Sequence, residues 1–360
     1  MEKLTRVALD AMGGDHAPGE VIKGAVDAVN ACQRVKVYLV GQEKRVTEEL
    51  AKYQYDKDRI EVVHAEEVIE TAEPPVLAIR NKKDSSLVKA LLMVKNNEAD
   101  AFVSAGSTGA TLVGGQVLIG RIQGIARAPL APVLPTERGP VLLIDCGANV
   151  DARASQLVQF AKIGSIYMEN VMHRKDPKVA LVNIGAEEEK GNALVKEAYP
   201  LLKNCPDIHF VGNIEARDIP AGGLGKEGVD VIVCEAFVGN VILKMYEGTA
   251  RSLMHVIKDA LMGSVRGKIG GFLIKPILKG VLSKYDAEQY GGAPMLGLKG
   301  LVVKAHGSSN AGEIKQAILQ CVDFHEQNVN EQIRSKIVED PIQPKIVEET
   351  MQGKTEQGEV

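Results

Sequence analysis

Seven short apolar runs of this 360-residue chain end in clusters of Gly, Asn, Ser, Asp or His, residue types that bind anions or transfer protons. The clusters lie in LDAMGGDHAP (9–18), FVSAGSTGAT (102–111), LIDCGANVDA (143–152), LVNIGAEEEKGN (181–192), FVGNIEARD (210–218), VIVCEAFVGN (231–240) and VVKAHGSSN (302–310). A helical pattern follows most of them. In parallel α/β sheets, ligands bind outside the carboxyl ends of the strands. The sequence therefore predicts that these clusters line one binding cleft.

The segment SAGSTGA is a candidate anion site. Ser104 is expected to end a strand, and Gly106, Ser107 and Thr108 are expected to open a helix. Backbone N–H groups near glycine and the positive end of the helix dipole attract an anion, although an ordinary Ser or Thr helix cap has the same pattern. No G-x-x-x-x-G-K-[ST] motif is present and no G-x-G-x-x-G follows any of the strand-like runs, so phosphate or a phosphoryl group is favoured over a nucleotide.

The segment DAMGGDHAP places two carboxylates and an imidazole around a Gly-Gly turn. Its candidate site residues are Asp10, Gly14, Asp15 and His16. Such a group can transfer protons or hold a metal ion. The alternative is a turn whose aspartates only accept backbone hydrogen bonds, but a His before Ala-Pro favours a functional role.

The segment IDCGANVD brings Asp145 and Asn149 to another strand end as candidate ligands for substrate oxygens. Cys146 could act as a nucleophile, but a Cys at the end of a buried strand is more often a small apolar filler. No His partner is visible in the sequence, and Cys234 has still less support as a nucleophile. Asn149 is therefore the favoured ligand of this segment.

The remaining strand ends supply amides and a few cations. Asn amides recognise phosphate or carbonyl oxygens without adding charge, and a Lys at the mouth of a sheet stabilises an oxyanion. The candidates of this kind are Asn183, Asn213, Glu235, Asn240, Lys244, Lys304 and His306. The segment NKKDSS (81–86) is either a similar basic element or an exposed, capped helix start.

Residues 263–300 interrupt this pattern with a basic, apolar insertion. Apolar residues recur there at helical spacing, and five cations but no acid lie between residues 263 and 284. This pattern is typical of an amphipathic helix at a membrane surface or of a groove for an acidic partner. A helix packed in a dimer interface explains it equally well, and these roles can coexist. The candidate membrane or carrier-protein contacts are Arg266, Lys268, Lys275 and Lys279.

Alternating strands and helices must position these residues. Strand-like runs lie near 5–10, 35–40, 60–64, 100–104, 141–145, 178–184, 208–212, 229–234 and 301–305, and helical patterns lie between them. The alternation predicts an α/β fold with a mostly parallel sheet and helices on both faces. We expect one catalytic domain over residues 1–335, long enough for two lobes, with a helical insertion at about 247–290 and a polar tail at 336–360.

The bulk composition excludes several classes of protein. Hydrophobic residues make up 45% of the chain and charged residues 25%, as in ordinary globular proteins. With 4% aromatic residues, no Trp and a net charge of −4, nucleic-acid binding is not expected. The five Cys form no C-x-x-C pair, so neither a zinc site nor a disulfide framework is expected. No signal peptide and no apolar stretch of about 18 residues is evident, which favours a cytoplasmic protein without a membrane span.

Taken together, these motifs resemble the bacterial PlsX-type phosphate acyltransferases of phospholipid synthesis. The resemblance rests on DAMGGDHAP, SAGSTGA, IDCGANVD, LVNIGAEEEKGN, FVGNIEARDI, CEAFVGNV, YGGAPMLG and VVKAHGSSN, in this order. It implies that acyl-[acyl carrier protein] and inorganic phosphate are converted to acyl phosphate and free carrier protein, and that the product feeds a glycerol-3-phosphate acyltransferase. It also implies a homodimer without cofactor or metal, peripheral contact with the membrane, and a fold similar to isocitrate and isopropylmalate dehydrogenases and to phosphotransacetylases.

In such a reaction phosphate is itself the nucleophile, so the protein has to hold phosphate against the thioester carbonyl and stabilise the oxyanion. The expected phosphate ligands are Ser104, Gly106, Ser107 and Thr108. The residues expected to orient phosphate or the acyl carbonyl are Asn149, Asn183 and Asn213. The expected charge-stabilising lysine is Lys304 or Lys244, and the expected proton donor is His16 or His306.

Three other functions compete with this interpretation. A phosphotransacetylase would use coenzyme A in place of the carrier protein. A dehydrogenase of the isocitrate type would need a metal-binding acid cluster and a nucleotide site, neither of which is evident in the sequence. A non-catalytic scaffold on the membrane surface is the alternative from a different class.

Overall fold

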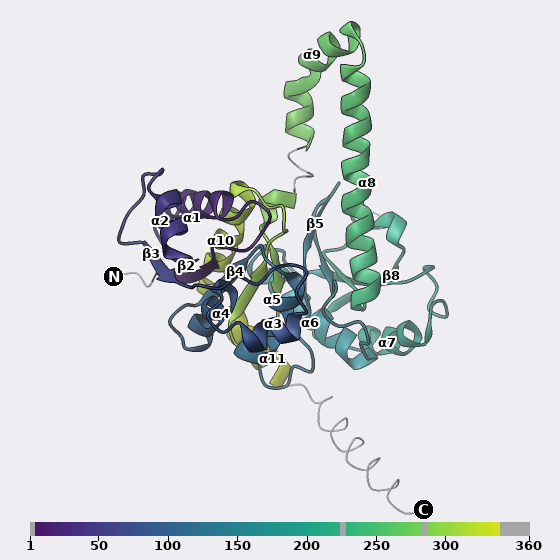
Figure 1. The fold of residues 1–360 in the computed structure, drawn as a ribbon. Helices are drawn as coiled ribbons and strands as arrows, with labels where there is room; N and C mark the ends of the chain where they lie inside the picture. Colours follow the sequence, from purple (N-terminus) through teal and green to yellow (C-terminus); the bar gives the residue numbers. More distant parts are fainter. Residues whose placement is uncertain (1–3, 224–227, 283–284, 286, 339–360) are drawn as a thin grey trace, which may run out of the picture.

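Two mostly parallel β-sheets form the body of the molecule, and a helical hairpin projects from it (Figure 1). The computed structural model describes residues 4–223, 228–282, 285 and 287–338. Most of the expected polar tail at 336–360 lies outside these residues. None of the helices in this described part is both long and apolar enough to cross a bilayer.

The first sheet has the strand order β10-β11-β4-β1-β2-β3. All neighbouring strands are parallel except for β10, which pairs with β11 in the antiparallel direction. The strands are β1 (Thr5–Asp10), β2 (Val35–Gly41), β3 (Ile60–His64), β4 (Ala101–Ser104), β10 (Ala293–Met295) and β11 (Leu301–Lys304).

Both faces of the first sheet are covered by helices. Val7 and Leu9 pack on the side of α1 (Gly19–Ala31) and α10 (Ala311–Glu326), whereas Ala8 packs on the side of α4 (Ser86–Lys95). Successive side chains of a strand point to opposite faces, so a strand covered on both faces has to be apolar throughout. This explains why the strand-like runs were visible in the sequence.

The second sheet has the order β5-β6-β9-β7-β8, again parallel except for one antiparallel edge strand, β5. The strands are β5 (Val133–Thr136), β6 (Gly139–Ile144), β7 (Lys178–Val182), β8 (His209–Ile214) and β9 (Val231–Val233). Leu142 and Ile144 belong to the same hydrophobic cluster as the buried face of α6 (Ala154–Asn170), and α7 (Ala193–Lys203) lies beside α6. Leu143 packs on the opposite side, with the first turns of α8 (Ala236–Met262).

The two sheets are joined along their antiparallel edges. Leu130 forms an antiparallel bridge with Met295, the last residue of β10, and the chain continues from Leu130 into β5 of the second sheet. The Ala131 N–H donates to the Pro294 carbonyl, and the Leu296 N–H donates to the Pro129 carbonyl, both at 3.0 Å. The segment 129–131 is therefore a hydrogen-bonded seam between the sheets.

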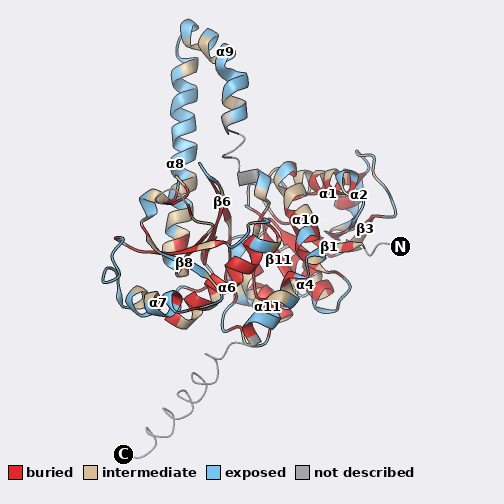
Figure 2. Ribbon diagram, turned by 180° about the vertical axis from the view of Figure 1, so that it is seen from behind, coloured by how far each residue is buried: buried red, intermediate tan, exposed pale blue. Residues whose placement is uncertain are grey.

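The remaining helices are short, apart from the hairpin. They are α2 (Glu43–Leu50), α3 (Pro75–Asn81), α5 (Thr108–Gly114) with the following π-helix (Gly115–Ile119), the 3₁₀ turns Ala216–Asp218 and Ala287–Tyr290, and α11 (Val329–Val338). The hairpin consists of α8, which is 27 residues or about 40 Å long, and α9 (Val265–Leu282). Its outer part is almost wholly exposed (Figure 2).

The expected α/β fold is confirmed, and the expected strands are all present. Two strands and one helix, β5, β10 and α3, were not predicted because each spans only three to seven residues. The segment after the last strand forms two helices, α10 and α11, with Asn328 at a φ of 51° between them. This left-handed backbone position ends the first helix.

Gly239 is the position at which α8 approaches β6 most closely. A Cβ atom there would lie 1.9 Å from the Asp145 carbonyl oxygen, whereas a Cβ at Gly248 in the same helix would meet nothing within 4 Å. We expect Gly239→Ala to lower the free energy of unfolding by about 1–3 kcal/mol because the backbone must move. Gly248→Ala should leave it unchanged or raise it by up to about 1 kcal/mol. Urea unfolding of both variants measures this, and equal effects would contradict the close approach.

Candidate active site at the carboxyl ends of the strands

Three neighbouring strands of the first sheet end in Asp10, Ser104 and Lys304. β4 lies between β1 and β11, Lys304 is level with Ser104, and Leu9 is level with Val103. Asp10 consequently lies beside Ser104, and the Ser104 hydroxyl donates to the Asp10 carboxylate with an Oγ–Oδ2 distance of 2.7 Å. The register of three parallel strands thus brings together three residues from distant parts of the chain.

The Ser104 hydroxyl shapes the loop that follows it. It accepts a hydrogen bond from the Gly106 N–H at 2.9 Å, and its own O–H donates a hydrogen bond to Asp10. The other Asp10 oxygen accepts a hydrogen bond from the Met12 N–H at 3.3 Å. A Cβ atom at Gly13 would lie 2.5 Å from Asp10 Oδ2, so the two loops touch at a glycine. Ser104 and Gly106 therefore already use, within the protein, the donors that were expected to hold phosphate.

Lys304 and Asp10 form a buried charged centre, with exposed fractions of 7% and 2%. Burial raises the pKa of Asp10, and hydrogen bonds from the Ser86 and Ser104 hydroxyls oppose this. Burial lowers the pKa of Lys304 to about 8, and the nearby carboxylates of Asp10 and Asp15 oppose this. Lys304 is therefore still mostly charged at pH 7. Ser86, at the start of α4, joins the site through its hydroxyl, which the capping pattern of NKKDSS did not reveal.

The loops after β1 and β11 are tied to each other. The Asp15 N–H donates to the Gly307 carbonyl at 2.7 Å. Gly14 has a φ of +109°, and a Cβ atom there would lie 2.9 Å from the Ala105 Cβ. The loops after three strands therefore pack against one another, as expected for one edge of a parallel sheet.

The two candidate histidines lie on the exposed outer side of these loops. His16 and His306 are both exposed. The His306 Nδ1 accepts a hydrogen bond from the Ser308 N–H at 3.3 Å and lies 2.9 Å from the Ser308 hydroxyl. Both side chains can therefore be reached from solvent.

The first turn of α5 opens toward solvent. The Ser107 hydroxyl caps this turn by accepting from the Ala110 N–H at 3.3 Å. Thr108 is exposed, and the Gly109 position is in close contact with Pro75 of α3, whose Cγ would lie 2.4 Å from an added Cβ. The first N–H groups of a helix have no acceptor within the helix. Thr108, with its hydroxyl and backbone N–H, is therefore the most accessible anion donor of SAGSTGA.

At the end of β6, Asp145 and Asn149 hold the seam between the sheets. Asp145 Oδ1 accepts from the N–H groups of Leu130 at 2.9 Å and Ala148 at 3.3 Å, and Oδ2 accepts from the Asn149 amide at 2.6 Å. The Asn149 amide also donates to the Ala128 carbonyl at 3.0 Å. Burial raises the pKa of Asp145 to about 6, against the effect of these hydrogen bonds. The polar atoms of both residues thus organise backbone.

Asn183 and Asn213 hold the long loop that follows β7. The Asn183 amide donates to the Lys190 carbonyl at 3.2 Å, and its oxygen accepts from the Ile184 N–H at 2.7 Å. The Asn213 amide donates to the Glu187 carbonyl at 3.0 Å. Its buried Oδ1 has no hydrogen-bond partner among the described residues. Of the two side-chain NH2 groups and two side-chain oxygens of these residues, only the Asn213 oxygen is therefore open to a ligand without competition from hydrogen bonds to the backbone.

Of the three candidates at the start of α8, one caps the helix and two lie in its next turns. The Glu235 carboxylate caps the helix by accepting from the N–H groups of Phe237 at 2.6 Å and Val238 at 2.9 Å. Asn240 is half-buried one turn later, and Lys244 is exposed on the following turn. These residues lie at the carboxyl edge of the second sheet, whereas Lys304 and Ser104 lie at that of the first.

The cysteines at the strand ends are poor nucleophiles. Burial is the main cause that raises the pKa of both Cys146 and Cys234 well above the ordinary range, so little reactive thiolate forms. Among the residues that the structure describes, no group of three or more His, Cys, Asp or Glu side chains is arranged to hold a metal ion.

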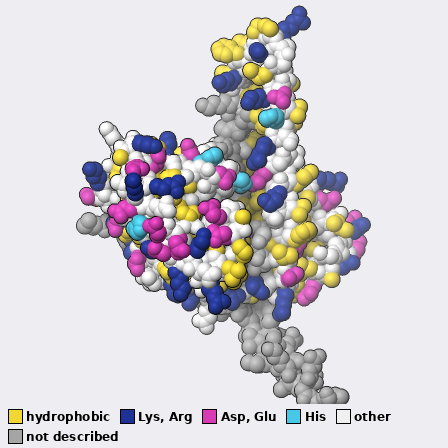
Figure 3. All heavy atoms as spheres, viewed as in Figure 1, with side chains coloured by type: hydrophobic (Ala, Val, Ile, Leu, Met, Phe, Trp, Pro, Cys, Tyr) yellow, Lys and Arg dark blue, Asp and Glu magenta, His cyan; other side chains and the backbone are white. Residues whose placement is uncertain are grey.

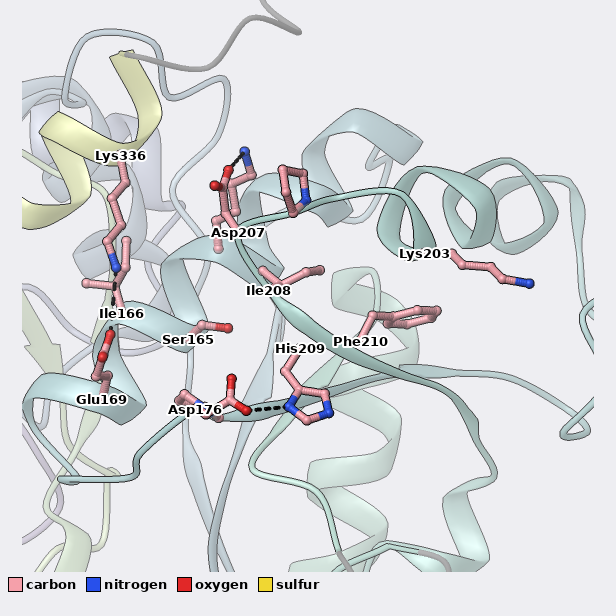
Figure 4. Close-up of a pocket in the computed structure, with 13 residues that line it drawn as sticks. Ser165, Ile166, Glu169, Asp176, Lys203, Asp207, Ile208, His209, Phe210 and Lys336 are labelled. Carbon is pink, nitrogen blue, oxygen red and sulfur yellow. Dashed lines mark hydrogen bonds and ion pairs between the residues drawn. The ribbon is translucent and has the colours of Figure 1, made fainter.

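A separate cavity of about 580 Å³ lies near the amino ends of β7 and β8 (Figure 4). Most of its ionisable side chains pair with one another, whereas Lys203 pairs with Glu188 outside the cavity. The pairs are Lys162–Asp207 at 2.7 Å, His209–Asp176 at 2.6 Å and Lys336–Glu169 at 3.6 Å. Because ligands of parallel α/β sheets bind at the carboxyl ends of the strands, we assign the candidate active site to Lys304 and the start of α5.

The charge of Asp10 is expected to keep Lys304 protonated. Asp10→Asn retains an oxygen that accepts from Ser104 but removes the negative charge, so the pKa of Lys304 should fall below about 8. Nuclear magnetic resonance of ¹³C-labelled lysine measures this pKa. Asp58→Asn, at an exposed position outside the site, is the control. A Lys304 pKa that rises or stays constant in Asp10→Asn would refute the coupling.

Comparison with known proteins identifies the family. The model of the family described as "Fatty acid synthesis protein" matches residues 5–332. A phosphate acyltransferase of Clostridium novyi is 49% identical over 332 residues, which cover 92% of this chain and 98% of that protein. A phosphate acyltransferase of Clostridium tetani is 47% identical over 333 residues, with the same two shares.

Solved structures match in fold. The EutD phosphotransacetylase from Staphylococcus aureus has a TM-score of 0.57 at 18% identity and covers 91% of this chain and 95% of its own. A phosphotransacetylase from Streptococcus pyogenes has a TM-score of 0.56 at 16% identity, covering 89% and 94%. At these identities the likeness concerns the fold, while the sequence relatives confirm the resemblance found in the motifs: this chain belongs to the PlsX-type phosphate acyltransferase family.

Proposed function

We propose that this protein transfers the acyl group of an acyl-[acyl carrier protein] to inorganic phosphate by direct attack of phosphate on the thioester. An oxygen of phosphate forms a bond to the carbonyl carbon, the carbon–sulfur bond breaks, and the thiolate of the carrier leaves and takes up a proton. The products are acyl phosphate and free carrier protein. No covalent enzyme intermediate is required, in keeping with the raised pKa of both strand-end cysteines.

The observation that carries this proposal is a buried lysine at the same edge of the sheet as an open helix start. Lys304 is level with Ser104, and the loop after Ser104 leads within four residues to Thr108. Phosphate at Thr108 would be held by a hydroxyl, by helix N–H groups and by the positive end of the helix dipole. Lys304 would offset the negative charge that develops on the carbonyl oxygen, in a site where burial strengthens the interaction.

The proton that the thiolate takes up has two candidate sources. A thiol has a pKa of about 8.5, so a donor speeds departure of the thiolate only modestly. His16 and His306 are exposed on the loops around Lys304 and can deliver a proton from solvent. Asn149, Asn183 and Asn213, which were expected to orient the substrate, donate their amides to backbone carbonyls of neighbouring loops instead.

Removal of the Thr108 hydroxyl tests the phosphate site. Thr108→Val has the same shape but lacks the donor, so the KM for phosphate should rise about tenfold, as for one lost hydrogen bond to a charged group. Thr47→Val, on the exposed side of α2, is the matched control and should leave the KM unchanged. An unaltered phosphate dependence of Thr108→Val would remove this residue from the site.

Lys304→Met should lower kcat by about 10²-fold or more, because the developing charge loses its partner. In the wild-type protein, kcat/KM for phosphate should fall as the pH rises through about 8, where Lys304 of the free enzyme loses its proton. Acyl phosphate formation by the variant and by the wild type, measured from about pH 6 to about pH 10, checks both predictions. This range extends roughly two pH units to each side of the lysine pKa. A Lys304→Met enzyme with wild-type kcat would refute the assigned role.

The fold likeness to phosphotransacetylases supports a second candidate, in which coenzyme A carries the acyl group. Initial rates with acyl-[acyl carrier protein] and with acyl-coenzyme A, each at varied phosphate, separate the two. We expect the carrier protein to give the higher kcat/KM. The acyl phosphate would then serve a glycerol-3-phosphate acyltransferase.

We also propose that the projecting hairpin provides the contact with a second subunit and with an anionic membrane surface or the acidic carrier protein. Large apolar side chains of the hairpin are exposed, including Val265 at 74%, Phe272 at 78% and Leu273 at 67%. Basic side chains lie among them (Figure 3). The candidate cations within the described residues are Arg266, Lys268 and Lys275, all exposed or partly exposed, whereas the side chain of Lys279 lies outside the described residues. Exposed apolar surface of this kind marks an interaction site, and a cytoplasmic protein with peripheral membrane contact would use it in this way.

Charge reversal tests the membrane role of the hairpin. Lys268→Glu combined with Lys275→Glu should weaken binding to phosphatidylglycerol-containing vesicles by about tenfold or more, at roughly 1 kcal/mol for each lost cation and further repulsion from each added acid. Lys196→Glu on α7, another exposed lysine, is the control. Vesicle sedimentation measures binding, and size-exclusion chromatography shows whether the oligomer persists. Unchanged vesicle binding with unchanged KM for the acyl carrier would leave the hairpin a purely structural element.

A further inference from the structure

We propose that Asp15, in the loop after β1, makes the enzyme selective for inorganic phosphate over sulfate, because its carboxylate accepts a hydrogen bond from the protonated oxygen that phosphate carries and sulfate lacks. This inference rests on the proposed attack of phosphate on the thioester. It adds to that reaction the means by which the site recognises its smaller substrate.

Asp15 lies against the loop that follows Lys304. Its N–H donates to the Gly307 carbonyl at 2.7 Å, and a Cβ atom at Gly307 would lie 3.6 Å from Asp15 Oδ2. The preceding residue, Gly14, is in close contact with the loop after β4, since a Cβ there would lie 2.9 Å from the Ala105 Cβ. Contacts with the loops after two other strands therefore hold Asp15 at the edge of the sheet where Lys304 ends β11.

The Asp15 carboxylate lies near the Lys304 ammonium group but is not occupied by it. Together with Asp10, it opposes the effect of burial on the pKa of Lys304. Asp15 is nevertheless exposed, and among the described residues no hydrogen bond or ion pair engages its side-chain oxygens. These oxygens are therefore open to a ligand that comes to Lys304.

The two carboxylates near Lys304 differ in what they can offer a substrate. Asp10 is 2% exposed and already accepts hydrogen bonds from the Ser104 hydroxyl at 2.7 Å and the Met12 N–H at 3.3 Å. Asp15 has its acceptor oxygens unused and reachable from solvent. Contact with the substrate therefore falls to Asp15.

The proposed reaction brings phosphate into reach of this carboxylate. The attacking phosphate oxygen has to come within about 3–3.5 Å of the carbonyl carbon, while Lys304 offsets the charge on the carbonyl oxygen. Phosphate consequently lies close to Lys304, where the charge of Asp15 also acts.

The chemistry of a carboxylate then decides which anion is accepted. An ionised carboxylate can only accept hydrogen bonds. Near neutral pH inorganic phosphate carries at least one proton, so one of its oxygens can donate to Asp15 in a strong, charge-assisted hydrogen bond. Sulfate has no proton to donate and meets only repulsion, which is how a site rejects a ligand of the same shape. The protonated oxygen held by Asp15 also leaves the unprotonated oxygens of phosphate for attack on the carbonyl carbon.

The test compares sulfate with arsenate, which is protonated as phosphate is. The wild-type enzyme is first assayed for acyl phosphate, and absence of this product would refute the proposed function itself. Both anions are then measured as competitors of phosphate at one fixed pH. In the wild type, the Ki of sulfate should exceed that of arsenate by about tenfold or more, the value of one hydrogen bond to a charged group.

In Asp15→Asn this ratio of Ki values should fall toward one, because an amide can donate to sulfate as well as accept from arsenate. Asp10→Asn is the matched control, since it also removes a negative charge near Lys304 but should keep the wild-type ratio. Asp58→Asn, at an exposed position outside the site, should change neither Ki.

Three results would overturn the inference while the proposed function stands. The first is a wild-type enzyme that sulfate and arsenate inhibit equally. The second is a ratio in Asp15→Asn equal to that of the wild type, which would leave Asp15 acting only on the charge of Lys304. The third is an equal fall of the ratio in Asp10→Asn, which would attribute the selectivity to that charge.

Discussion

The site depends above all on the register of three parallel strands. With β4 between β1 and β11, Lys304 is level with Ser104, and Asp10 lies on the other side of Ser104. A slip of one residue in either pair would turn these side chains to the opposite face. The hydrogen bond between the Ser104 hydroxyl and Asp10 reinforces the register at the strand ends. Burial of Asp10 and Lys304, and hence the pKa of each, follows from the same arrangement.

The second sheet is held in place by a different polar contact. Asp145 accepts the Leu130 N–H from the segment that pairs with Met295, so one carboxylate connects the end of β6 to the edge of the first sheet. Asn149 supports the same segment through the Ala128 carbonyl.

Much of the fold could be predicted from the sequence because parallel strands buried on both faces leave continuous apolar runs. The strands β5 and β10 escaped because three or four residues containing proline, such as Pro135 and Pro294, carry no periodicity. The positions of the site residues at strand ends could also be predicted. Their individual roles could not, since an Asn that binds substrate and an Asn that binds a loop carbonyl look alike in sequence. Asp145 shows why: its partner Leu130 lies 15 residues away and is set by the tertiary fold.

A carboxylate beside the candidate phosphate site is unfavourable on charge alone, and the geometry explains how it can be tolerated. Burial raises the pKa of Asp10, which is 2% exposed, but the hydrogen bonds that it accepts from Ser104 and Met12 favour its charged form. Its negative charge opposes the effect of burial on Lys304 and keeps that lysine largely protonated. Without Asp10, burial alone would favour the neutral amine, which cannot stabilise an oxyanion. Phosphate brought near Lys304 would act in the same direction as Asp10 and raise the lysine pKa again. The ammonium group would then be most firmly charged when substrate is bound, which is when the reaction requires it.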